Sequence, residues 1–287
     1  MRPEPAVKEP HLAGRWYPAE PAALDAIVRE LLAAGGPRRA GVRAILVPHG
    51  PYRGSGPVAA RAFATVAGGA RRAIVLSPTH YAEFRGAATL PMRAYRTPLG
   101  PVELDGECAA ALGRLPFVRA NPAVFLREHG LEVQLPLLQA ALPGSRAALL
   151  LLGSLEPGEV VTLAEALRPM LDDETLLVVS SDLVHYGRRF GYLPVPPTDA
   201  ATVAAALRRL DEDVLSRILA RDADGFVRWL ADTGAAICGR HAIEVMLRTL
   251  PPGMPGEQLA HASSLDADGA HEHVVGYAAV AFGAAPA

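Results

Sequence analysis

The stretch "TLLVVSSDLVHYG" runs from residue 175 to residue 187 and changes character half-way along. Its first half is a continuous apolar run, which predicts a strand over 175–181 that is buried on both faces of a sheet. Its second half places Asp182 and His185 directly after that strand. Polar residues in this position mark either a strand that surfaces into a loop or side chains that reach a site at the sheet edge. The pattern of the remaining chain bears on this choice.

Apolar runs of the same kind recur along the chain. They are "VRAILVP" (42–48), "RAIVLSP" (72–78) and "RAALLLLG" (146–153). Helical patterns are expected at 56–66, 105–112, 132–142, 157–171 and, beyond the proline-rich patch 193–198, at 200–209, 211–220, 223–232 and 238–250. Closing strands are expected at 258–263 and 273–282, and they need a sheet to join. We therefore expect one α/β domain over 1–287, with a largely parallel central sheet flanked by helices.

Composition and charge argue against several classes of protein. Half of the 287 residues are hydrophobic, which is ample for a sizeable core. The net charge of -2, without a cluster of Lys and Arg among aromatic residues, argues against a nucleic-acid partner. The longest apolar stretch, 147–153, is far shorter than the roughly 20 residues that span a bilayer, and the first residues lack a signal-peptide core. Two cysteines cannot build a disulfide framework, so we expect a cytoplasmic protein without a membrane partner.

Histidines follow three of the four buried strands. His49 lies in "VPHG", His80 in "SPTH", and His185 follows Asp182 in "SSDLVH". One histidine after a strand is more often a loop or packing residue. Three at equivalent positions are harder to explain that way, because the carboxyl ends of parallel strands meet at one edge of the sheet. We therefore expect at least two of them to share a site.

Histidine is the commonest metal ligand, and two histidines with an anionic ligand suit Fe(II), Zn(II) or copper. The anionic candidates are Asp182, Glu128, Glu132 and Cys238. Cys238 begins the expected helix 238–250, where the helix N-terminus would lower the pKa of its thiol and favour the thiolate. The alternative is an inert, buried cysteine.

The motif "REHGLEVQLPLLQ" (127–139) is the most polar entry to any expected helix. Glu128 and Glu132 are four residues apart and would share one face of a continuous helix. Acidic residues at a helix start can also act as simple caps that complement the helix dipole. Capping explains one acid well, and two acids together with His129 less well.

Two other site classes are not supported. The glycine-rich loop 49–63 lacks both the Gly-Lys-Ser/Thr of a P-loop and the spacing of a dinucleotide fingerprint. No G-x-S-x-G motif is present, so a serine hydrolase is improbable. The glycines of the loop are better explained by a close approach of the backbone to the site.

The ordered motifs resemble those of the Memo-like family, also called AmmeMemoRadiSam system protein B. The resemblance covers the chain from Ala13 to Phe282. The motifs that carry it are "AGRWYPA", "VPHGPYRGSGPVAA", "SPTHY", "YRTPLGPVELD", "EHGLEVQLPLLQ", "VVSSDLVHYG", the "CG" before a helix, and the terminal "VVGYAAVAF". This family is similar in fold to class III extradiol ring-cleavage dioxygenases.

The resemblance implies a metal site and its surroundings. It implies that the metal ligands are His49, His80 and Cys238, and that His185, His129 and Asp182 line the same cavity as acid–base or orienting residues. The chain departs from the family pattern in two places, with "HGPY" for the usual "HAGY" and "EHGLE" for "EHSLE". Neither departure removes a candidate ligand.

Two functions follow from these expectations. The first is an iron-dependent, dioxygenase-like oxidoreductase that chelates a small molecule, with Fe(II) as the expected metal and copper or zinc as alternatives. The second is a non-enzymatic metal-binding or interaction module that takes a peptide, or partner proteins of the AmmeMemoRadiSam system, at a repurposed cleft. Cys238 discriminates between them, because a thiolate in place of a carboxylate favours copper over oxygenase iron.

Overall fold

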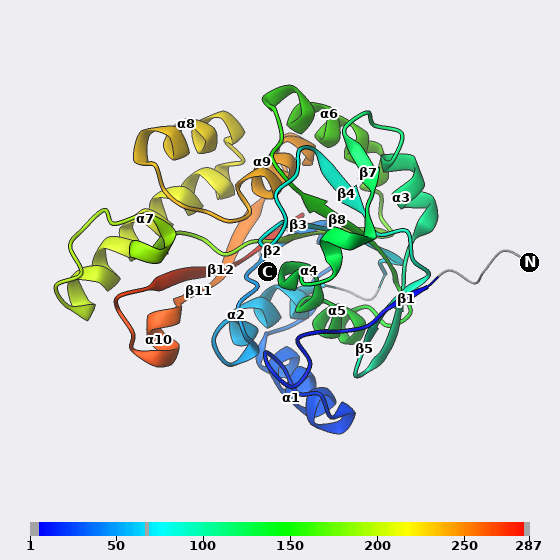
Figure 1. The fold of residues 1–287 in the computed structure, drawn as a ribbon, viewed down its shortest axis with the longest axis horizontal. Helices are drawn as coiled ribbons and strands as arrows, with labels where there is room; N and C mark the ends of the chain where they lie inside the picture. Colours follow the sequence, from blue (N-terminus) through cyan, green and yellow to red (C-terminus); the bar gives the residue numbers. More distant parts are fainter. Residues whose placement is uncertain (1–5, 67–68, 284–287) are drawn as a thin grey trace, which may run out of the picture.

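The computed structural model describes residues 6–66 and 69–283, and within them the main sheet has nine strands (Figure 1). Its central strands are parallel and are ordered β2 (Ala44–Val47), β9 (Thr175–Ser180), β3 (Arg72–Pro78) and β8 (Arg146–Leu152). These are the four strands expected from the apolar runs. The predicted α/β class with a largely parallel central sheet is confirmed.

Shorter or antiparallel strands extend both edges of this sheet. Beside β2 lie β12 (Val274–Phe282), which pairs antiparallel with β2, then β10 (His185–Tyr186) and β11 (Gly256–Ser263), which both pair with β12. Beside β8 lie β4 (Ala87–Thr89) and β7 (Val118–Ala120). The chain on both sides of 193–198 thus contributes strands to the same sheet.

Two layers of helices cover the sheet (Figure 1). One face packs against α3 (Gly106–Leu112), α6 (Pro157–Leu167), α7 (Ala200–Ala220), α8 (Ala223–Thr233) and α9 (Arg240–Thr249). The other face packs against α1 (Pro21–Ala34), α2 (Tyr52–Thr65) and α5 (Leu135–Ala141). Side chains alternate between the two cores along each strand: Ala44 and Leu46 face the first, Ile45 and Val47 the second.

Several elements differ from the expectation. The expected helix 132–142 is divided into α4 (His129–Glu132) and α5, while the expected helices 200–209 and 211–220 form the single α7. The remaining elements are α10 (Ser264–Asp268) and a separate small sheet of β1 (Val7–Lys8), β5 (Ala94–Thr97) and β6 (Gly100–Glu103). Within 6–66 and 69–283, no helix is long and apolar enough to cross a membrane.

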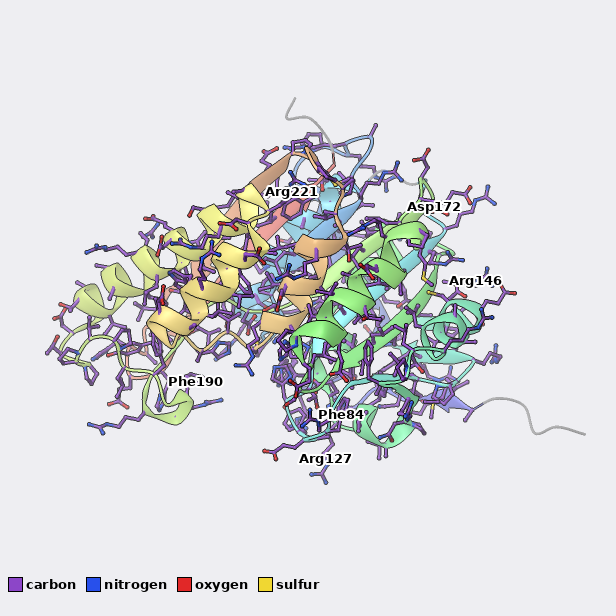
Figure 2. The ribbon with its side chains drawn as sticks, turned by 90° about the horizontal axis from the view of Figure 1, so that it is seen from above. Phe84, Arg127, Arg146, Asp172, Phe190 and Arg221 are labelled. Carbon is purple, nitrogen blue, oxygen red and sulfur yellow. The ribbon has the colours of Figure 1, made fainter. Side chains whose placement is uncertain are left out.

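The carboxyl ends of the parallel strands point to one side of the molecule. In Figure 2, Phe84, Arg127 and Phe190 lie toward that side, and Asp172 and Arg221 lie toward the opposite side. Phe84 follows β3, whereas Asp172 precedes β9. The candidate site residues therefore lie on the side of Phe84 and Phe190.

Candidate metal centre

Three of the predicted residues follow neighbouring strands by the same number of residues. His49, Asp182 and His80 each come two residues after the end of β2, β9 and β3, which are adjacent in the sheet. Parallel strands deliver such positions to one edge. The rings of His49 and His80 accordingly stand perpendicular to one another with centroids 4.8 Å apart.

His49 is buried at the middle of this group. Its Nε2 lies 3.2 Å from Sγ of Cys238 and 3.8 Å from Oδ2 of Asp182. Its backbone N–H donates to Oδ1 of Asp182 at 2.8 Å. Asp182 therefore holds the main chain of His49 rather than a ring N–H, and its second oxygen faces the same point as the thiol.

Glu128 orients His80. Its carboxylate accepts hydrogen bonds from the backbone N–H and from Nδ1 of His80, at 2.8 and 2.7 Å. Burial alone would raise the pKa of Glu128, but the hydrogen bond and charge of His80 outweigh it and lower that pKa. Because an ionised carboxylate only accepts, Nδ1 of His80 carries a proton. In the part of the chain that the structure describes, Glu128 thus contacts a histidine rather than joining either metal-binding group described below.

His129 and His185 are two further histidines beside this group, and both are neutral imidazoles. The ring of His129 lies against that of His80 with centroids 3.9 Å apart, and its Nδ1 is 3.0 Å from the hydroxyl of Tyr81. Burial lowers the pKa of His129 to about 3 and that of His185 to about 4. Nδ1 of His185 lies 2.9 Å from the carbonyl of Leu183, which only accepts. That nitrogen therefore carries the proton, and Nε2 of His185 is unprotonated.

Cys238 does not have the predicted environment. It lies two residues before α9, whose N-cap is Gly239, so it is outside the helix. Burial raises the pKa of its thiol, and the nearby charge of Asp182 raises it further. The prediction that the helix N-terminus lowers this pKa is wrong, because burial and a carboxylate outweigh the helix dipole. A metal bound to this sulfur would therefore displace a proton.

Among the described residues, two groups of side chains have donor atoms close enough to hold a metal ion. The first is His49, His80 and His129, and the second is His49, Asp182 and Cys238; within each group the donor atoms lie within 4.8 Å of one another. The trio implied by the family resemblance is divided between them, with His49 in both. Imidazole nitrogens, a carboxylate and a thiol are the donors that zinc, iron and copper take, so the residues present fit a transition metal.

Glu132 lies apart from this centre. Its fully buried carboxylate accepts hydrogen bonds from the backbone N–H groups of His11 and Leu12 and from the hydroxyls of Tyr17 and Tyr95. The continuous helix on which Glu128 and Glu132 would share a face does not form, because Glu128 precedes α4 as its N-cap. Glu132 attaches the N-terminal segment to the domain.

A cleft of about 750 Å³ opens beside the histidines. Its lining includes His80, His185 and Cys238, together with the aromatic rings of Phe84 and Phe190. Figure 2 shows both phenylalanines on the same side of the molecule. Donor atoms from both candidate groups thus border a space that a small molecule can enter.

Comparison with known proteins matches the sequence of this chain to a family. The profile described as Memo-like protein matches residues 8–281. The chain belongs to the Memo-like family. It is 32% identical to a MEMO1 family protein of Methanopyrus kandleri, over 96% of this chain and 98% of that protein. It is 31% identical to a memo-1 homolog of Caenorhabditis elegans, over 82% of this chain and 69% of that protein.

One solved structure, of an uncharacterized protein from Escherichia coli K12, is similar over 84% of this chain and 99% of that chain. Its TM-score is 0.48 and its sequence identity is 13%. The family assignment rests on the sequence matches.

Sequence reasoning missed two buried residues of this Memo-like centre. Ser180 and Gln134 both contact the surroundings of His49 and were not assigned a role. The signal was present, since both lie in motifs that also carry candidate ligands, "VVSSD" and "EHGLEVQ". Their contacts depend on the pairing of distant segments and could not be read from either motif alone.

Gly130, one of the two departures from the Memo-like pattern, packs so closely against Ser77 that a larger residue would clash with it. A Cβ at position 130 would lie 2.2 Å from Oγ of Ser77. We expect Gly130→Ala to lower the free energy of unfolding by about 1–3 kcal/mol, as overpacking does. The cost should largely vanish in a Ser77→Ala background, where the clashing oxygen is gone. Thermal unfolding of the four proteins of this double-mutant cycle measures the coupling, and an equal cost in both backgrounds would contradict this close packing.

Proposed function

We propose that this Memo-like protein binds one transition-metal ion at His49 and uses it in oxidoreductase chemistry on a small molecule in the adjoining cleft. The observation that carries the proposal is that two groups of donor atoms share the buried imidazole of His49, and that one member of each group, His80 and Cys238, lines that cleft. A binding surface without chemistry has no need of so many ligating groups around one nitrogen. The family resemblance to class III extradiol dioxygenases supports the reaction class.

Fe(II) is the metal that we propose for this activity. The imidazoles of His49, His80 and His129 suit iron, and they suit zinc and copper as well. When bound, the metal would supply the capacity to chelate a substrate oxygen and to activate O2. The ligand assignment of His49, His80 and Cys238 remains a prediction.

The proposed work of the protein's own side chains is to hold protons and to shape the cleft. His185 is suited to act as a base, because Nδ1–H donates to Leu183 and the neutral ring keeps a lone pair on Nε2. His129 is also neutral and is held by Tyr81. Phe84 and Phe190 offer apolar contact to the body of a ligand.

A second candidate function is metal binding without oxygenase activity. The position of Cys238, with Sγ at 3.2 Å from His49, favours it, because sulfur is a soft ligand that selects Cu(I) or zinc. In this proposal the cleft receives a peptide or a partner protein of the AmmeMemoRadiSam system, and the metal supports that surface.

Metal analysis followed by oxygen uptake separates the two proposals. The protein is purified without oxygen, its metals are measured, and it is loaded with Fe(II) and offered a panel of catechols. The oxidoreductase proposal predicts substrate-dependent oxygen uptake that is lost in His185→Ala without loss of iron. Tight Cu(I) binding through Cys238, with no uptake for any catechol, would instead support the second function.

A further inference from the structure

Ser180 is the meeting point of a buried hydrogen-bond network behind His49. Its Oγ lies 2.5 Å from the carbonyl of Gly130, 2.9 Å from Nε2 of Gln134 and 3.0 Å from Nδ1 of His49. The side chains of Ser180, Gln134 and His49 are all buried. Each donor and acceptor must therefore be satisfied within the network.

Counting protons assigns every bond in this network. Nε2 of Gln134 also lies 2.9 Å from the carbonyl of Pro48, an acceptor, so that atom is the amide nitrogen and donates to Ser180. The hydroxyl of Ser180 has one proton, and the carbonyl of Gly130 can only accept it. The serine oxygen must then accept from its third neighbour, Nδ1 of His49.

We infer that Ser180, held in place by Gln134, is a positioning residue that fixes the tautomer of His49 with the proton on Nδ1. Nε2 is then unprotonated and presents its lone pair. It faces Sγ of Cys238 at 3.2 Å, where the protonated thiol of the metal-free protein can donate to it. The proton also lies on Nδ1 in His80 and His185, because these Nδ1 atoms face a carboxylate and a carbonyl.

The tautomer of His49 limits how many metal ions the two candidate donor groups can hold. With Nδ1 of His49 engaged by Ser180, a single nitrogen is left for a metal, so the ring cannot bridge two ions. The two groups then serve one ion, whose ligands besides His49 can come from either group or from both. This consequence rests on the proposed metal function, whereas the tautomer itself does not.

The fold explains why this serine reaches that histidine. Ser180 is the last residue of β9 and pairs with Val47, the last residue of β2, so it lies beside the segment that leads to His49. Gln134 lies at the break between α4 and α5. The division of the expected helix thus places an amide between β2 and β9.

Nitrogen-15 NMR of histidine in the metal-free protein tests the tautomer directly. The protein as it exists should show His49 as a single Nδ1–H form. Ser180→Ala should populate the Nε2–H form and weaken Zn(II) binding about 10- to 100-fold, the range typical when a partner that orients a metal ligand is lost. Ser180→Thr keeps the hydroxyl and should restore both readouts.

Thr249→Ala is the matched control, since it removes a buried hydroxyl that bonds only within α9. It should leave both the His49 tautomer and the Zn(II) affinity unchanged. An Nε2–H form of His49 in the wild type, or a Ser180→Ala variant with unchanged tautomer and affinity, would overturn the inference. If the wild type shows the Nδ1–H form but binds no metal, the proposed function fails while the tautomer assignment stands.

Discussion

Substituting His49 with alanine is expected to abolish metal binding, because both candidate donor groups use its imidazole. The loss should exceed the roughly 100-fold limit typical of residues that only orient a ligand. The measurement is the metal content and the metal affinity of the anaerobically purified variant. The metal-free protein should remain folded, since burial keeps the imidazole of His49 neutral and its removal therefore breaks no ion pair.

Companion variants show which donor group holds the ion. His80→Ala removes a ligand from the first group alone, and Cys238→Ser removes the sulfur from the second alone. Weaker binding in one variant alone identifies that group, and weaker binding in both identifies ligands from both groups, as in the predicted set of His49, His80 and Cys238. His241→Ala is the control, because His241 lines the same cleft but belongs to neither group. Wild-type metal content in His49→Ala would show that the ion binds elsewhere.

The second large effect is expected at Glu132, and it concerns stability. Glu132→Gln places an amide among five donors in a fully buried position: the backbone N–H groups of His11 and Leu12, Nδ1 of His11, and the hydroxyls of Tyr17 and Tyr95. Breaking such a buried charged network costs about 3–5 kcal/mol, which lowers the melting temperature by roughly 10 °C in a chain of this size. Metal content at low temperature should not change, because the carboxylate contacts the N-terminal segment and not the histidines of the centre.

The stability difference between wild type and Glu132→Gln should depend on pH. Burial opposes ionisation of Glu132, but hydrogen bonds from Tyr95, Tyr17 and the main chain outweigh it and lower its pKa below the usual 4.5. A lowered pKa in the folded state stabilises the protein above the unfolded value, and this contribution is lost as pH falls through the folded value. The difference should therefore be full at neutral pH and shrink below about pH 4.5.

Glu128→Gln is the matched variant in the same motif, with the opposite expected result. It removes the carboxylate that holds Nδ1 of His80, so it should weaken metal binding about 10- to 100-fold with a smaller change in melting temperature. If Glu132→Gln loses metal and Glu128→Gln does not, the assignment of the two acids is reversed.

The central sheet could be predicted from sequence because its strands are buried on both faces. Such strands are continuous apolar runs, as in β2, β3, β8 and β9. The small sheet of β1, β5 and β6 has mixed polarity and short strands. Local pattern carries no comparable signal for these elements.

The same contrast holds at the site. The convergence of the strand-end residues follows from the geometry of parallel strands, which is why His49, His80 and Asp182 could be placed at one edge. The pKa of Cys238 and the partner of Glu132 depend on what distant segments bring to them. The environment of Cys238 was therefore predicted wrongly from its helix, and the partners of Glu132 could not be predicted from its motif.

The most direct test of a single metal at His49 is an anomalous-difference map of crystals grown anaerobically with Fe(II). We predict one peak per chain, bonded to Nε2 of His49 at a distance of about 2.0–2.2 Å. Its other ligands should come from His80, His129, Asp182 and Cys238. Two peaks at the centre, or one peak whose ligands do not include Nε2 of His49, would contradict the account.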